Sequence, residues 1–128
     1  MDVIIDTHAL IWFLEGADRL SFKAKEIIEK KQNKRYVCVA SIWEITIKSS
    51  LGKLNFKPSP TEIEKILFIN DIKVLGIKID HLTVLQILPH HHRDPFDRLL
   101  IAQAISEDLS IISADQHFKP YPAVIIWD

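Results

Sequence analysis

Short apolar runs alternate with segments of helical pattern along nearly the whole of this chain. Five runs have the length and composition of buried strands: Val3–Ile5, Tyr36–Val39, Lys73–Ile77, Ser110–Ser113 and Val124–Ile126. Strands that alternate with helices build β–α–β units, which place the strands in a parallel sheet with helices on both of its faces. The sequence therefore predicts an α/β fold of three layers, α/β/α, around a central parallel sheet of four to five strands.

Capping and stop signals divide the remaining residues into helices. Gly16 and Gly52 are typical of helix ends, and residues 58–60, Pro-Ser-Pro, indicate a turn. We expect helices over residues 7–14, from the cap Ser21 to about Gln32, from Ser41 to about Leu51, from the cap Thr61 to Asn70, from the cap Asp80 through Leu88, and from Asp94-Pro95 to about Leu109.

The length and the composition limit the class of protein. A chain of 128 residues fits one domain, so we expect residues 1–128 to form a single unit. No apolar run approaches the ~18 residues that a membrane span needs, and the acidic start of the chain lacks the pattern of a signal peptide. The single cysteine, Cys38, excludes an internal disulfide and fits a buried position in a reducing compartment. We therefore expect a cytoplasmic protein with no membrane contact.

The formal net charge of −1 hides an uneven distribution of charge. Residues 19–57 hold ten basic and three acidic side chains, a net of +7, and the rest of the chain carries −8. The total excludes a protein that coats nucleic acid through a generally basic surface. The lysine-rich stretch from Lys23 to Arg35 has two interpretations: a solvated helix face, or a basic rim that captures RNA phosphates.

Four acidic residues fall where the predicted strands end. Asp6 directly follows the first strand and Asp115 the fourth, while Glu44 and Asp97 lie in the first turns of two helices. Parallel sheets bind ligands outside the carboxyl ends of their strands, so these carboxylates are expected to meet at one edge. Clustered carboxylates repel one another unless a cation lies between them. Hard oxygen ligands of this kind select Mg²⁺ or Mn²⁺, ions that assist the cleavage of phosphodiesters.

Each acid also has a purely structural interpretation. Asp6, Asp94 and Asp115 are good helix or turn caps, and Asp97 would interact favourably with a helix dipole. Ser41-x-x-Glu44 matches a capping box. Capping alone, however, does not require all of these acids to occupy the same edge of one sheet.

Four segments resemble the motifs of the PIN domain family, and within it the VapC-like toxins of bacterial toxin–antitoxin pairs. These segments are Val3–Leu10, Ser41–Ile45, Asp94–Ala104 and Ser113–Phe118. The resemblance covers nearly the whole chain, and the segment from Asp94 is its most specific part. It implies a PIN-like fold and a Mg²⁺- or Mn²⁺-dependent endoribonuclease that acts as a toxin, with RNA as its substrate and a cognate antitoxin as its partner.

By this resemblance, Asp6, Glu44, Asp97 and Asp115 are the catalytic residues and the metal ligands. Asp94 lies one helical turn from Asp97 and is a weaker candidate ligand. The hydroxyls of Thr7 and Ser113 would bind a metal water or a carboxylate, or else satisfy local backbone groups. The alternative function is a non-catalytic PIN-like module that binds RNA or protein. The sequence leaves open whether one or two metal ions bind and whether DNA is also cut.

Other conspicuous side chains are assigned as follows. Arg93 and Arg98 flank the acids and are candidates for contact with substrate phosphate, or for salt bridges to those acids. The run His90, His91 and His92 is interpreted as an exposed loop rather than a zinc site. Trp12, Phe13 and Trp43 are expected in the core. The helix around residues 9–14 is apolar on nearly all sides, so we expect another chain to cover part of it, in a homodimer or through an antitoxin peptide.

Overall fold

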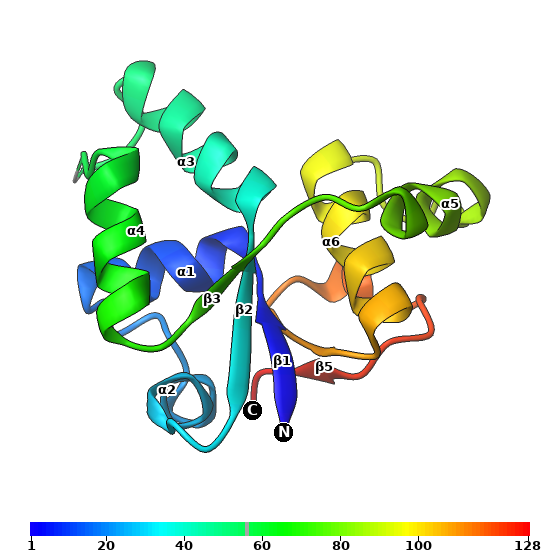
Figure 1. The fold of residues 1–128 in the computed structure, drawn as a ribbon, viewed down its shortest axis with the longest axis horizontal. Coiled ribbons are helices and arrows are strands. Elements are labelled where there is room, and N and C mark those ends of the chain that lie inside the picture. Colours follow the sequence, from blue (N-terminus) through cyan, green and yellow to red (C-terminus); the bar gives the residue numbers. More distant parts are fainter. Residues whose placement is uncertain (56) are drawn as a thin grey trace.

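The structure is a computed structural model and describes residues 1–55 and 57–128. Figure 1 shows helices packed on both sides of a twisted sheet. In chain order the elements are β1 (Asp2–Ile5), α1 (Thr7–Glu15), α2 (Phe22–Glu29), β2 (Lys34–Cys38), α3 (Val39–Ser50), α4 (Pro60–Ile69), β3 (Lys73–Leu75), α5 (Ile79–Ile87), α6 (Pro95–Glu107), β4 (Ser110–Ile112), the short 3₁₀ helix η1 (Gln116–Phe118) and β5 (Ile125–Ile126). Within the described ranges, no helix is long and apolar enough to cross a membrane.

The five strands form one sheet in the order β3-β2-β1-β4-β5, and every neighbouring pair is parallel. Ile5 at the end of β1 lies level with Val37 of β2 and Ile112 of β4. The carboxyl ends of these three strands therefore meet at one edge of the sheet. The prediction of a parallel sheet of four to five strands is confirmed.

Each face of the sheet has its own hydrophobic core because side chains alternate along a strand. Val3 and Ile5 pack with residues of α1, α2 and α4, whereas Ile4 between them packs with residues of α6. Figure 1 shows α1, α2 and α4 on one side of the sheet, with α5 and α6 on the other. The predicted three-layer α/β/α arrangement is confirmed.

Several helix boundaries differ from the prediction. The caps at Ser21 and Asp94 are confirmed, but α2 already ends at Glu29 because Lys30 is extended. Helix α4 is capped by Ser59 rather than Thr61, through a capping box with Glu62. Helix α5 begins with Lys78 at its cap, which leaves Asp80 inside the first turn.

Helix α3 begins at Val39, two residues before the expected start at Ser41. Strand β2 pairs with β3 through Cys38 and Leu75, and the chain turns into the helix directly after this pair. The buried sulfur of Cys38 accepts a hydrogen bond from the Ala40 amide at 3.3 Å and so caps the helix. A preference for hydroxyl caps therefore placed the start of this helix incorrectly.

The apolar helix α1 is covered in part by its own chain. Ala9, Leu10 and Ile11 are buried, and Trp12 and Phe13 are half-buried against the same core. Helix α3 packs against α1 and covers part of its apolar surface. The prediction that another chain covers a further part of this helix stays a prediction.

Candidate active site

The structure places the predicted acids on or beside four different elements at the carboxyl edge of the sheet. The Asp6 amide donates to the Ile112 carbonyl oxygen at 3.1 Å, which joins the end of β1 to the end of β4, just before Asp115. Asp6 is only 3% exposed and Glu44, on α3, only 9%. Asp97 lies in the first turn of α6. Three layers of the fold thus contribute carboxylates to one place.

The other acids of the cluster affect the pKa of Asp97. Burial is the largest cause of a rise in the pKa of Asp97 to about 8, and the negative charges of four other carboxylates add to it: Asp94, Asp6, Glu44 and Asp115. Burial also raises the pKa of Asp6, against the opposing effects of the Ser113 hydroxyl and the Ala9 amide. The fold therefore concentrates more negative charge here than its own groups neutralise.

Three of the acids also act as caps. Asp6 Oδ1 accepts from the Ala9 amide at 2.8 Å, and Asp115 Oδ1 accepts from the His117 amide at 2.8 Å. Asp94 Oδ1 accepts from the amides of Phe96 and Asp97. These bonds occupy one oxygen of each carboxylate, so capping and cation binding are compatible at the same residue.

The capping-box interpretation of Glu44 is wrong, because Ser41 lies inside α3 and not at its cap. Glu44 Oε2 instead forms an ion pair with Lys48 Nζ at 3.1 Å. In the part of the chain that the structure describes, the buried Glu44 Oε1 has no hydrogen-bond partner. An unpartnered buried carboxylate oxygen beside other acids fits a divalent cation such as Mg²⁺ or Mn²⁺.

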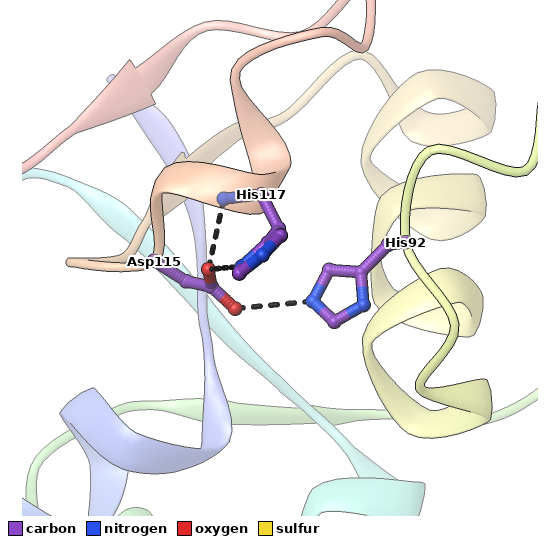
Figure 2. A group of neighbouring side chains, drawn as sticks. All are labelled: His92, Asp115 and His117. Carbon is purple, nitrogen blue, oxygen red and sulfur yellow. Dashed lines mark hydrogen bonds and ion pairs between the residues drawn. The ribbon is translucent and has the colours of Figure 1, made fainter.

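Two histidines join this cluster, and the sequence analysis missed both (Figure 2). His92 Nε2 lies 3.0 Å from Asp115 Oδ2 and 3.1 Å from Asp97 Oδ2. His117 Nδ1 lies 2.8 Å from Asp115 Oδ1. Burial acts to raise the pKa of Asp115, but the hydrogen bonds from His117 and His92 outweigh it and lower that pKa.

The expected exposure of the histidine run holds for two of its members. His90 and His91 are exposed, but the side chain of His92 is only 11% exposed. The sequence offered one signal that these histidines belong to the site, which is their position. His92 lies two residues before Asp94, and His117 lies two residues after Asp115.

The model of the PIN domain matches residues 3–123. The chain belongs to the PIN domain family. No curated protein sequence matches this chain.

Two solved structures have the same fold as this PIN domain. One is VapBC2 from Rickettsia felis bound to a DNA fragment from its promoter, with 16% identity, a TM-score of 0.76 and full coverage of both chains. The other is a toxin–antitoxin complex from Klebsiella pneumoniae, with 19% identity, a TM-score of 0.64 and coverage of 97% of this chain and 96% of that one.

The two arginines that flank the acids have different surroundings in this PIN domain. Arg98 is buried and donates to the carbonyl oxygens of Leu88 at 3.2 Å, Pro89 at 2.9 Å and His92 at 3.5 Å. Its expected contact with phosphate or with a carboxylate is therefore wrong, since its guanidinium is used by the backbone. Arg93 is exposed and lines a surface hollow with Asp94 and His117, so it remains a candidate.

The two hydroxyl candidates also differ. Thr7 Oγ1 donates to Ser41 Oγ at 2.9 Å, which fastens the start of α1 to α3. Ser113 Oγ accepts from the Asp115 amide at 3.0 Å and lies beside Asp6. Ser113 therefore contacts two of the acids, whereas Thr7 holds two helices together.

The lysine-rich stretch lies away from the acids. Lys34 of β2 lies opposite Asp2 of β1 in the strand register, at the amino end of the sheet. Figure 1 shows α2 at that end, far from the starts of α3 and α6. Arg35 is buried and donates to backbone carbonyl oxygens, including that of Ile28. The interpretation as a rim around the site is wrong. Lys48 forms an ion pair with Glu44, and Lys119 and Arg93 line surface hollows with Asp115 and Asp94.

Trp43 was expected in the core, but it is 61% exposed. Its ring packs edge-on against Phe96 with the ring centres 5.2 Å apart. These two aromatic residues immediately precede Glu44 and Asp97, so an exposed indole stands at the border of the acid cluster.

Proposed function

We propose that this PIN domain is a Mg²⁺- or Mn²⁺-dependent endoribonuclease. The observation that supports this most is the convergence of carboxylates from β1, α3, α6 and the end of β4, where the pKa of Asp97 rises to about 8. PIN domains are typically nucleases and generally use divalent metals.

The metal would be held by four carboxylates, those of Asp6, Glu44, Asp97 and Asp115. Asp94 would affect the metal indirectly, through the negative charge that it places beside Asp97. A bound divalent cation would supply Lewis acidity to the phosphate and activate the attacking water. The Ser113 hydroxyl would orient the carboxylate of Asp6 and hold the backbone amide of Asp115. Lys48, Arg93 and Lys119 would hold RNA phosphates beside the acids, since phosphate contacts position a nucleic acid without reading its sequence.

Cleavage of RNA by purified protein tests this proposal. With Mg²⁺ or Mn²⁺, we expect the wild type to cut RNA and Asp6→Asn and Asp97→Asn to lose at least 100-fold in rate, because each change removes a ligand charge. Asp18→Asn, in an exposed turn away from the site, is the matched control and should cut at the wild-type rate. Equal cutting by all four proteins would refute the carboxylate mechanism. A wild type that binds RNA but never cuts it would instead support a non-catalytic binding module.

A toxin role for this nuclease is part of the same proposal. Both similar structures contain toxin–antitoxin assemblies, which supports a cognate antitoxin as the partner and a cytoplasmic place of action. Expression of the chain alone should arrest growth, and Asp97→Asn should relieve the arrest. Homodimer formation stays a prediction, and Phe68 and Ile69 on α4 are among the exposed apolar side chains that such an interface could cover.

A further inference from the structure

The loop between α5 and α6 holds His92 firmly in place. The His92 amide donates to the Tyr121 hydroxyl at 2.8 Å, and that hydroxyl donates to the Pro89 carbonyl oxygen at 2.8 Å. The buried Arg98 guanidinium reaches the His92 carbonyl oxygen at 3.5 Å. The imidazole also packs on Phe118, with the ring centres 5.5 Å apart. Little freedom is left to this side chain.

The hydrogen bonds of His92 assign its neutral tautomer. Its Nδ1 accepts a hydrogen bond from the Asp94 amide at 3.2 Å, so Nδ1 carries no proton. The proton of the neutral ring is then on Nε2, which lies 3.1 Å from Asp97 Oδ2 and 3.0 Å from Asp115 Oδ2. One N–H group therefore points between two carboxylates that belong to the acid cluster.

A second cation that bridged Oδ2 of Asp97 and Oδ2 of Asp115 would need that same space, whereas the other oxygen of each carboxylate does not contact His92. Mg²⁺ binds carboxylate oxygens at about 2.1 Å, which places the ion between them, where the Nε2 proton of His92 points. Glu44 Oε1, by contrast, is buried and has no hydrogen-bond partner within the described residues. We propose that His92 takes the place of a second metal ion, so that the acid cluster binds one divalent cation. This inference rests on the proposed metal site.

The distances alone would also allow His92 to act as a metal ligand. His92, Asp115 and His117 each offer one ligand atom, and these atoms lie within 4.8 Å of one another, as a transition metal would require (Figure 2). A metal on Nε2, however, needs the ring proton on Nδ1, where it would oppose the Asp94 amide. The observed hydrogen bonds thus favour a donor at Nε2 over a metal ligand.

The number of Mn²⁺ ions bound tests the proposal without RNA or activity. Titration of metal-free protein, followed by the electron paramagnetic resonance of free Mn²⁺, should give one bound ion for the wild type. His92→Ala should bind two, because the change opens the space between Asp97 and Asp115. The matched control His90→Ala, an exposed residue of the same loop, should bind one. His92→Ser, whose short side chain does not reach between Asp97 and Asp115, should also bind two ions and serves if the alanine variant does not fold.

The inference would be overturned if the wild type bound two Mn²⁺ ions. It would also be overturned if a folded His92 variant bound only one. A wild type that binds no Mn²⁺ would overturn the metal-dependent function as well, so the two failures are distinguishable. Zn²⁺ affinity, measured against a chelating dye, should change less than twofold in His117→Ala. A tenfold loss in both His117→Ala and His92→Ala would make His92 a metal ligand and refute the proposal.

Discussion

Asp97 occupies a position that both favours and opposes its negative charge. As the third residue of α6 it interacts well with the helix dipole, an effect worth at most about 1 kcal/mol at most sites. Burial and four neighbouring carboxylates act in the opposite direction and raise its pKa to about 8. The opposing effects are the larger, so metal-free protein keeps a proton on Asp97 at neutral pH.

The stability of metal-free protein should therefore fall as the pH rises. The unfolded carboxyl group loses its proton near pH 3.8, but the folded one keeps it to about pH 8, so the contribution of Asp97 is full below pH 3.8 and is lost between these values. Asp97→Asn should remove this slope and raise the Tm at pH 8 by about 5 °C. Thermal melts with a chelator measure the difference. A variant that melts below the wild type at pH 8 would contradict this explanation.

The positions of some residues of the candidate site could be predicted from the sequence, and those of others could not. Asp6 and Asp115 were predictable because an acid directly after a buried parallel strand must lie at the carboxyl edge. His92 was not predictable, because its position depends on hydrogen bonds from Arg98 and to Tyr121, residues that no local pattern connects to it.

At the scale of the element, the loop from Leu88 to Asp94 depends on one buried side chain. The Arg98 guanidinium holds three carbonyl oxygens of this loop, those of Leu88, Pro89 and His92. A planar fork of N–H donors suits this task better than an ammonium group. The loop is thus ordered by the helix that follows it.

Arg93 and Arg98 should respond to the same substitution in different ways. Arg98→Gln should lower the free energy of unfolding by about 2 kcal/mol, because buried carbonyl groups lose charged donors. Arg93→Gln should leave stability unchanged and weaken the binding of RNA to the Asp97→Asn background. Denaturant titrations and fluorescence anisotropy separate the two effects. A loss of RNA affinity that is confined to Arg98→Gln, with full stability, would reverse the assignment.

The prediction of elements succeeded where a pattern has a local cause. All five strands and six helices were anticipated, because apolar runs and strong caps such as Ser21 and Asp94 act within one segment. The start of α3 was misplaced because the pairing of Cys38 with Leu75 of a distant strand decides where β2 ends. The burial of Trp43 was misjudged for a similar reason, since exposure depends on the neighbours of α3.

At the scale of the molecule, opposite charges are separated in space. The lysine-rich stretch lies at the amino end of the sheet, and the acids lie at the carboxyl edge with a few basic side chains around them. RNA bound at the acids would therefore contact the basic side chains around them and not the lysine-rich stretch.

Two triple variants with the same change in charge test this arrangement. Lys48→Gln, Arg93→Gln and Lys119→Gln together should weaken RNA binding and reduce the slope of log affinity against log salt by about 2, close to 0.7 for each lost contact. Lys23→Gln, Lys25→Gln and Lys30→Gln together should leave that slope unchanged. Anisotropy titrations over a range of salt concentrations supply both slopes, and equal slopes for the two variants would refute the separation.

Cys38 has a practical consequence beyond its place at the start of α3. The thiol is 1% exposed, and burial raises its pKa, so it presents little thiolate to a reagent in solution. A second cysteine introduced on the surface would react with a maleimide dye or a spin label far faster than Cys38. Probes for distance measurements can therefore be attached to this protein at chosen points while its native cysteine stays in place.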